Sequence, residues 1–374
     1  MKSLKRKVLV VIGTRPEAIK MAPVVLALRV LPWVDLRVLA TAQHRQMLDQ
    51  VLGAFDIAPD LDLDVMQADQ MLAGLTSRLL ERIDAVLDSE QPDVVLAQGD
   101  TTTVFTTALA CFYRRVSFGH VEAGLRTWDL ANPFPEEFNR VAVGRLARWH
   151  FAPTQSAKEN LLAEGVAPAT VHITGNTVID ALHHISDSIA MPMVASRERR
   201  VLLVTAHRRE NFGQPLRNIC TALLEIVESR PDVHLVYPVH PNPNVSVPAH
   251  EILAGHPRIC LCEPMEYMAF VGAMKSACLI LTDSGGIQEE APALGKPVLV
   301  LRNETERPEA IEAGVAKLVG TDTRTIVDET LRLLDCKDTY QQMAQGISPY
   351  GDGSAASRII QILTRDLAGA DPAD

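Results

Sequence analysis

The sequence has no hydrophobic run long enough to cross a membrane. The basic lead-in at residues 1–7 is followed by a short apolar run, 8–12, so we expect the first buried strand there and not a signal peptide. No CxxC pair occurs among the six scattered cysteines, which favours reduced thiols in a cytoplasmic protein over zinc sites or disulfides. A net charge of -10 argues against a broad nucleic-acid-binding surface.

Several catalytic signatures are missing as well. The sequence contains no GxSxG nucleophile elbow, no P-loop and no HExxH zinc motif, and its first strand lacks the later glycines of a dinucleotide fingerprint. The alternating carboxylates of 60–64 are typical of a solvated strand face and not of a metal site. We therefore expect neither a metal ion nor a cofactor.

What is present is a globular composition, with 47% hydrophobic and 22% charged residues in a chain of 374, a length that fits two domains. Short apolar runs alternate with helical patterns, which predicts βαβ units and parallel sheets. The expected strands of a first series are 8–12, 36–40, 94–98, 116–121 and 171–174, with helices over 17–31, 72–89, 102–113 and 135–147. The expected strands of a second series are 201–205, 235–239, 258–262, 278–282, 298–301 and 317–319.

This rhythm predicts an α/β fold of two Rossmann-like, doubly wound domains that face each other across a cleft, where the carboxyl ends of the strands meet a ligand. We place the first domain at 1–176 and the second at 201–353, joined by a helical linker over 177–200. The amphipathic pattern of 354–367 predicts a last helix that could pack back on the first domain.

The first strand ends in a turn that suits an anion. Gly13 permits a sharp bend, and Pro16 fits the first position of a helix because it lacks an N–H group. A helix N-terminus directly after a strand attracts anions, and Arg15 and Lys20 add positive charge within about one turn. Taken alone, the same pattern also fits a purely structural turn.

Three carboxylates in the first domain are candidates for acid–base chemistry. Asp100 directly follows one predicted strand and Glu122 ends the next, so a parallel sheet brings both to the same edge. Glu136 stands in the first turn of a predicted helix. Simpler explanations are a helix N-cap at Asp100 and a favourable helix dipole at Glu136. Together the three groups could supply a general base and a general acid.

The second domain offers positive charge at the corresponding edge. Its first strand runs into His207 and the two arginines after it, a cluster that is costly to place beside a buried strand without a function. Ser284 and the two glycines after it would open a helix with exposed N–H groups that suit a pyrophosphate. Glu290 could accept hydrogen bonds from ribose hydroxyls, and Arg307 adds a further cation. The pattern fits a nucleotide-activated molecule that undergoes proton transfer.

Eight motifs resemble those of the bacterial non-hydrolysing UDP-N-acetylglucosamine 2-epimerases, in order over nearly the whole chain. They are GTRPEAIK (13–20), TAQHR (41–45), QGDTTT (98–103), HVEAGLRT (120–127), TGNTVID (174–180), TDSGGIQEE (282–290), TERPE (305–309) and PYGDG (349–353). The resemblance implies a GT-B-like fold and interconversion of UDP-N-acetylglucosamine and UDP-N-acetylmannosamine. In that family UDP leaves by anti elimination, 2-acetamidoglucal stays bound, and UDP adds back with the proton delivered to the opposite face of carbon 2.

The resemblance also implies roles for residues. The implied acid–base carboxylates are Asp100, Glu122 and Glu136, with His207 near the departing phosphate; Asp100, Glu122 and His207 would also contact the substrate. The implied contacts of the UDP moiety are Arg15, Lys20, Ser284, Gly285, Gly286, Glu290 and Arg307, with Phe270 and the backbone of Met265 beside uracil. Some members bind a second UDP-N-acetylglucosamine as an activator, and the residues that could line such a pocket are Gln43, His44, Gln46, Arg209 and His240.

Other classes of protein stay open at this point. A GT-B glycosyltransferase shares the fold and the UDP site, although a retaining transferase does not need three carboxylates. A non-catalytic nucleotide-sugar sensor would not need the carboxylates and His207 together. Within the epimerases, the sugar could carry a 6-carboxylate or a 3-acetamido group. The family suggests a homodimer, with no nucleic acid and no membrane as partner.

Overall fold

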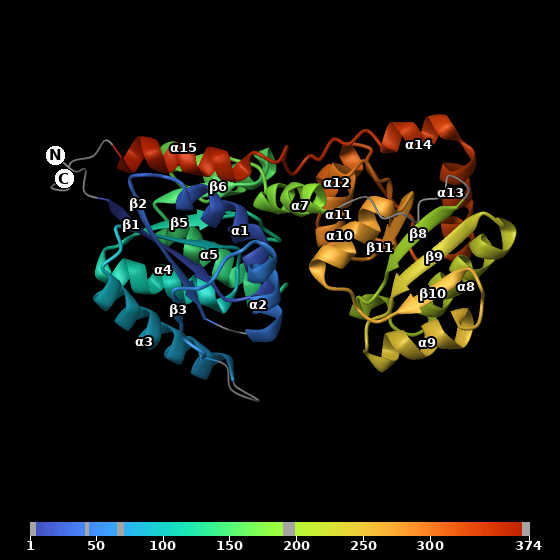
Figure 1. Ribbon diagram of the computed structural model, residues 1–374, viewed down its shortest axis with the longest axis horizontal. Helices are drawn as coiled ribbons and strands as arrows, with labels where there is room; N and C mark the ends of the chain where they lie inside the picture. The colour runs from blue at the N-terminus through green and yellow to red at the C-terminus, as the bar shows by residue number, and fades with distance from the viewer. Residues whose placement is uncertain (1–4, 42–44, 66–70, 190–198, 369–374) are drawn as a thin grey trace. The chain divides into compact units, whose positions relative to one another are not determined.

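The computed structural model describes residues 5–41, 45–65, 71–189 and 199–368, without the side chains of 45–47 and 49. The chain divides into two compact units, Met1–Ala181 together with Gly351–Asp374, and Leu182–Tyr350. Helix α7 (Thr177–Ser188) takes up the first part of the expected linker and passes from one unit into the other, while 190–198 lie outside the described residues (Figure 1).

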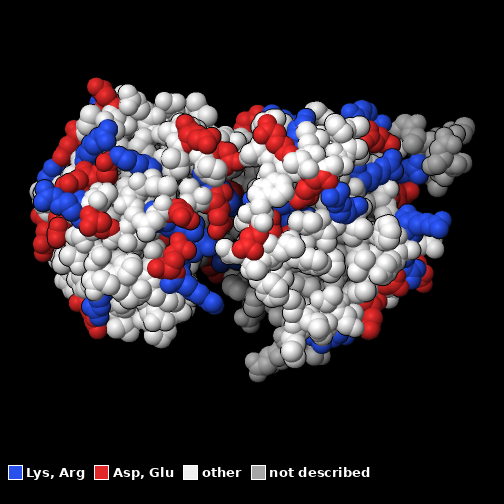
Figure 2. Space-filling model, turned by 180° about the vertical axis from the view of Figure 1, so that it is seen from behind, with Lys and Arg blue, Asp and Glu red and all other residues white. Residues whose placement is uncertain are grey.

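The surface carries charges of both signs. On the face shown in Figure 2, Lys and Arg side chains lie among Asp and Glu side chains in both units and do not gather by sign. Within the described ranges, no helix is both long enough and apolar enough to cross a membrane.

The first unit contains a seven-stranded parallel sheet in the order β3-β2-β1-β4-β5-β6-β7. Its strands are β1 (Arg6–Ile12), β2 (Val34–Ala40), β3 (Leu61–Asp62), β4 (Val94–Gln98), β5 (Ser117–Val121), β6 (Trp149–Ala152) and β7 (Val171–Ile173). Strand β4 is buried at every position, as expected of a parallel strand with helices on both faces. Strand β6 was not expected, because its four residues are too few to show a periodic pattern.

Helical segments alternate with the strands of this unit. They are α1 (Arg15–Arg29), α2 (Arg45–Ala54), α3 (Leu72–Glu90), α4 (Thr102–Arg114), α5 (Glu136–Leu146), α6 (Gln155–Ala163) and the short η1 (Pro168–Thr170). The last helix, α15 (Ala355–Leu367), returns to this unit and packs against α1 (Figure 1). Asp180 of α7 accepts hydrogen bonds from the amides of Ala355 (3.1 Å) and Ala356 (2.9 Å), so it caps the start of α15.

The second unit repeats the same winding with six parallel strands in the order β10-β9-β8-β11-β12-β13. These strands are β8 (Arg200–Thr205), β9 (Val233–Pro238), β10 (Ile259–Cys262), β11 (Leu279–Thr282), β12 (Val298–Val300) and β13 (Ala316–Leu318). The helical segments are η2 (Arg209–Asn211), α8 (Gln214–Ser229), α9 (Pro243–Leu253), α10 (Tyr267–Ser276), α11 (Gly285–Ala293), α12 (Pro308–Glu312), α13 (Thr323–Asp335) and α14 (Lys337–Met343). When these six strands are numbered from 1 in chain order, their order in the sheet is the Rossmann order 3-2-1-4-5-6.

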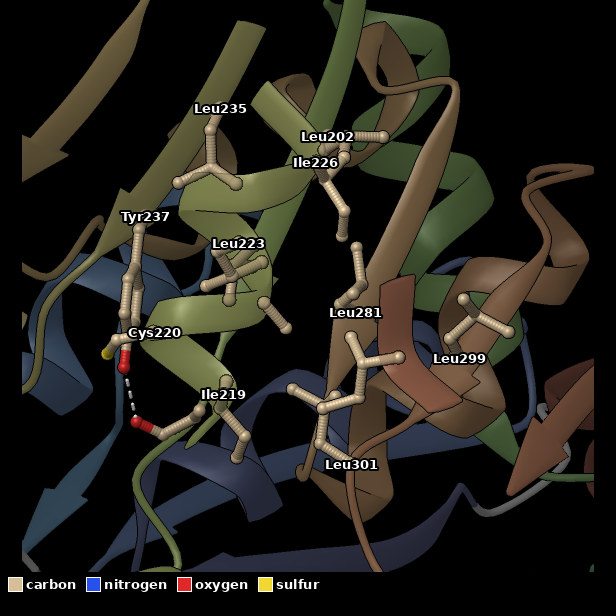
Figure 3. Close-up of a cluster of buried hydrophobic side chains, with 14 of the residues drawn as sticks. Leu202, Ile219, Cys220, Leu223, Ile226, Leu235, Tyr237, Leu281, Leu299 and Leu301 are labelled. Atoms are coloured by element: carbon tan, nitrogen blue, oxygen red, sulfur yellow. Dashed lines mark hydrogen bonds between the residues drawn. The ribbon is translucent and has the colours of Figure 1, made fainter. Parts of the chain in front are cut away.

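The core of the second unit lies between this sheet and the helix α8. Figure 3 shows Leu223 and Ile226 of α8 beside Leu202 and Leu281 from neighbouring strands, all fully buried. Tyr237 brings a hydroxyl into this core, and that hydroxyl donates to the backbone oxygen of Ala206 at 2.8 Å (Figure 3). Burying the ring is therefore favourable without leaving a polar atom unsatisfied.

In both units the strand order reverses direction once, between β1 and β4 in the first unit and between β8 and β11 in the second. At such a switch point the two following loops run to opposite faces of the sheet and leave a crevice at the carboxyl ends of the strands. The two doubly wound parallel sheets expected from the sequence are thus confirmed, and the switch points show where to examine each unit for a site.

Candidate active site

At the switch point of the first unit, the β1–α1 turn is held by a capping box. The hydroxyl of Thr14 accepts from the amide of Glu17 at 3.4 Å, and the carboxylate of Glu17 accepts from the amides of Thr14 (3.1 Å) and Gly13 (2.5 Å). Gly13 is required by space, because a Cβ atom there would lie 2.6 Å from Oγ1 of Thr103. Arg15 is half-buried and has no hydrogen bond or ion pair within the described part of the chain. The turn therefore presents a helix N-terminus and a cation together.

Glu122, at the end of β5, is the most constrained of the three carboxylates. Its backbone has φ 62°, a left-handed conformation that costs energy for a residue with a side chain. Its carboxylate is buried and accepts from Lys20 Nζ at 2.6 Å, from Asn176 Nδ2 at 2.7 Å and from the side-chain amide of Gln98. Strain that is held by three donors is typical of a functional site. Lys20, expected beside UDP, is thus placed against Glu122.

Asp100 stands in the β4–α4 loop, which is fixed from several sides. The carbonyl of Gly99 accepts from Nε2 of His120 at 2.7 Å, and the carbonyl of Asp100 accepts from Asn139 at 2.8 Å. Burial lowers the pKa of His120 to about 3, so the ring is neutral and donates from Nε2. A Cβ atom on Gly99 would lie 3.9 Å from the carboxylate of Glu122, so the Asp100 loop borders that carboxylate.

Helix α5 begins at Glu136 and also carries Arg140, whose side chain binds Asp100. One turn after Glu136, the guanidinium of Arg140 donates to Oδ2 of Asp100 at 2.8 Å and to Glu137 at 3.0 Å. Burial acts to lower the pKa of Arg140, but the charges and hydrogen bonds of Asp100 and Glu137 raise the pKa by more, so it lies above its ordinary value. The buried carboxylate of Glu137 also accepts from the amides of Thr127 and Trp128, each at 3.0 Å, and so fixes the preceding loop.

The structure thus brings Asp100 and Glu122 to one edge of the first sheet, and it places Glu136 one helical turn before Arg140, which binds Asp100. The residues that hold them were not identified from the sequence, namely Gln98, Asn139, Arg140, Asn176 and Glu137. Gln98 and Asn176 lie within motifs that were recognised, so the motifs were the available signal. Arg140 gave none, because its partner is 40 residues away in the chain.

At the switch point of the second unit, Ser284 stands at the N-cap position of helix α11, whose first residues are Gly285 and Gly286. A Cβ atom on Gly285 would lie 3.8 Å from Nη2 of Arg208 and 3.9 Å from Nη2 of Arg307. Two guanidinium groups therefore border a helix N-terminus, which is an arrangement suited to phosphate. Arg208 was part of the cluster noted after the first strand of this domain, but it was not singled out.

Asp283 organises the loop that carries His207. It is fully buried and accepts from the amides of His207 and Arg208 at 2.7 Å each, and from Asn211 Nδ2 at 3.1 Å. His207 stacks on His240 with ring centroids 5.6 Å apart. Burial lowers the pKa of His207, and Asp283 opposes this effect only in part, so the imidazole is neutral near pH 7. A neutral imidazole can take up a proton and, once protonated, deliver it.

The remaining nucleotide candidates lie on neighbouring elements of this unit. Glu290 of α11 accepts from the hydroxyl of Tyr267 at 2.8 Å, and Arg307 forms an ion pair with Glu289. Phe270 lies in α10 and is half-buried, as is Met265 just before that helix.

Only some of the expected activator-site residues can be placed. Gln43 and His44 lie outside the described residues, and so does the side chain of Gln46. Arg209 is exposed in η2, and His240 is exposed beside His207. Within the described part of the chain, no group of three His, Cys, Asp or Glu side chains is arranged to hold a metal ion.

Two Rossmann-like sheets, each with polar residues at its switch point, define a GT-B-like α/β protein. The family model for UDP-N-acetylglucosamine 2-epimerase matches residues 26–364. A curated UDP-N-acetylglucosamine 2-epimerase from Salmonella typhimurium is 53% identical over 368 residues, which cover 96% of this chain and 98% of that protein. The corresponding enzyme of Bacillus subtilis is 51% identical over 361 residues and covers 96% and 95%.

A solved structure of the enzyme from Neisseria meningitidis, bound to UDP-N-acetylglucosamine, is 46% identical with a TM-score of 0.87 and covers 96% of this chain and all of that one. The chain belongs to the UDP-N-acetylglucosamine 2-epimerase family.

Proposed function

We propose that the protein interconverts UDP-N-acetylglucosamine and UDP-N-acetylmannosamine by inverting carbon 2 of the sugar. The observation that carries this proposal is family membership over nearly the whole chain, with a relative whose solved structure holds UDP-N-acetylglucosamine. The carboxylates of Asp100 and Glu122 at one edge of the first sheet, with Glu136 at the start of α5, support it, because inversion needs a proton removed from one face of the carbon and delivered to the other.

In the proposed mechanism UDP leaves by anti elimination, 2-acetamidoglucal stays bound, and UDP then adds back. Direct removal of the weakly acidic proton at carbon 2 would build a carbanion, whereas elimination transfers the negative charge to the departing pyrophosphate. The charge would be received by Arg15, His207, Arg307 and the amides of Ser284, Gly285 and Gly286. Lys20 would also orient Glu122, and Glu290, Phe270 and the backbone of Met265 would hold the nucleoside.

Among the acid–base groups, the contacts favour different roles. Glu122 accepts from Lys20, Gln98 and Asn176, so its oxygens are already occupied by donors. Asp100 is held by Arg140, and Glu136 has no hydrogen bond or ion pair among the described residues. We therefore propose Asp100 and Glu136 as the groups that exchange protons with carbon 2, and Glu122 as the group that shapes the charge around them.

The test is to incubate the pure protein with UDP-N-acetylglucosamine, without any acceptor, and to follow the anomeric proton signals. Appearance of the UDP-N-acetylmannosamine signal is expected. Asp100→Asn and Glu136→Gln should each lower turnover about 10²- to 10⁴-fold while UDP binding changes much less. Sugar transfer that needs an added acceptor would instead identify a glycosyltransferase.

We also propose a cytoplasmic homodimer that supplies N-acetylmannosamine units for surface polysaccharide. Phe112 and Tyr113 at the end of α4 support the dimer, because these adjacent residues are 61% and 62% exposed and contiguous exposed apolar surface is typical of an interface. Sedimentation of the wild type should give twice the monomer mass, and Phe112→Ser with Tyr113→Ser should shift it toward monomer. A monomeric wild type would contradict the dimer.

A further inference from the structure

Glu17 is a buried carboxylate without a cation beside it. Only 2% of the residue is exposed, and its carboxylate accepts hydrogen bonds from the amides of Gly13 (2.5 Å) and Thr14 (3.1 Å) and from the hydroxyl of Thr101 (2.7 Å). No Lys, Arg or His pairs with it among the described residues. Because burying an unpaired carboxylate is costly, its presence needs an explanation beyond capping one helix.

The three donors come from two different loops at the switch point of the first unit. Gly13 and Thr14 form the turn that leads into Arg15, and Thr101 directly follows Asp100. Thr101 is also the N-cap of α4, where its hydroxyl accepts from the amide of Val104 at 3.4 Å and donates to Glu17. One carboxylate therefore ties the anion-binding turn to the loop of a proposed proton-exchanging group.

Little space is left between the two loops for them to shift independently. Thr103 of α4 and Thr41 after β2 share a hydrogen bond of 3.2 Å, and both hydroxyls would clash with a Cβ atom on Gly13, at 2.6 Å and 2.9 Å. The backbone of the turn thus rests directly on the first turn of α4. A change in the hydrogen bonds of Glu17 would therefore shift both the β1–α1 turn and the β4–α4 loop.

We propose that Glu17 is a positioning residue that holds Arg15 and Asp100 in register for the reaction. This inference rests on the proposed epimerase function and assigns Glu17 no direct contact with the substrate. The ionised carboxylate accepts all three hydrogen bonds, whereas a protonated one carries a hydrogen that must displace or reverse one of them. The ionised form is therefore the one that fixes both loops.

The two forms exchange near neutral pH. Burial raises the pKa of Glu17 to about 7; the hydrogen bonds from Thr101, Gly13 and Thr14 lower it, and the charge of Asp100 raises it. The charge that raises the pKa of Glu17 is that of Asp100 in the β4–α4 loop. The neighbouring ends of β2 and α4 contribute uncharged hydroxyls, those of Thr41 and Thr103, which lie against Gly13. Activity should therefore fall as the pH decreases through about 7.

Glu17→Gln tests this with the shape of the side chain preserved. We expect kcat to fall about 10- to 100-fold, as for a small misplacement of catalytic groups, and the acid limb near pH 7 to disappear. Thr101→Ser keeps the donor and should retain nearly wild-type kcat and pH profile. Thr101→Val removes it and should lower kcat about tenfold.

The outcomes separate the two proposals. An unchanged kcat and pH profile in Glu17→Gln would overturn the inference, and so would a lower kcat with the acid limb intact, since that indicates a structural role only. If Glu17→Gln does not fold, equal kcat values for Thr101→Ser and Thr101→Val would overturn it. A folded wild type that does not convert UDP-N-acetylglucosamine would refute the proposed function instead.

Discussion

The ion pair between Lys20 and Glu122 allows the sharpest test of the site's energetics. The two side chains are 16% and 6% exposed and their charged atoms are 2.6 Å apart. Glu122→Gln removes the charge but keeps the shape, and either orientation of the new amide faces its NH₂ group toward a donor, Lys20, Asn176 or Gln98. Removing one partner of a buried pair typically costs about 3–5 kcal/mol.

We therefore expect Glu122→Gln to lower the free energy of unfolding of the first unit by about 3 kcal/mol. For a unit of this size, that corresponds to a drop in Tm of about 6–12 °C, measured by calorimetry. The double variant with Lys20→Met should be more stable than the sum of the single effects predicts, by about 1–3 kcal/mol. An exposed pair serves as control, Arg324 with Asp328 at 3.3 Å, whose cycle should show no measurable coupling. Additive effects at Lys20 and Glu122 would refute the reasoning.

Three further changes probe the first unit. Asp180→Ala removes the acceptor of two amides of α15 and should destabilise the protein by about 1–2 kcal/mol, with faster hydrogen exchange in that helix; unchanged exchange would count against the cap. The stability of Glu17→Gln relative to that of the wild type should rise by about 2–3 kcal/mol from pH 5 to pH 8, because the folded-state pKa of about 7 lies above the ordinary value of 4.5 and ionisation of Glu17 therefore costs the wild type stability as the pH rises between these values. Urea unfolding at pH 5 and pH 8 measures this, and a gain that does not grow with pH would contradict it. Gly124→Ala places a Cβ 2.1 Å from the carbonyl oxygen of Ala157 at φ 94° and should cost about 3 kcal/mol or more; a wild-type Tm would be inconsistent with this packing.

The repeating pattern of strands and helices was readable from the sequence because parallel strands are continuous apolar runs. The runs at β1 and β4 stand out for this reason, whereas β6 and the two-residue β3 are too short to show a period. The expected helix 135–147 is observed as Glu136–Leu146, since Pro135 fixes its start.

The arrangement of the site was only partly predictable. The spacing in the sequence predicted that Asp100 and Glu122 follow the ends of neighbouring strands, and the structure places them there. It could not reveal that Arg140 binds Asp100, because this contact depends on how the loop before α5 folds back. It also gave Glu17 no role of its own, since a Glu in the first turn of a helix is ordinary until its burial is known.

The most direct test of the central claim is the reaction in heavy water. The purified protein, given UDP-N-acetylglucosamine in D₂O, should form UDP-N-acetylmannosamine that carries deuterium at carbon 2, seen as loss of the proton coupling to the anomeric signal. Long incubations should also release UDP and 2-acetamidoglucal. Product whose carbon 2 keeps its proton would contradict acid–base exchange through these carboxylates, and absence of any product from an intact, UDP-binding protein would contradict the epimerase function itself.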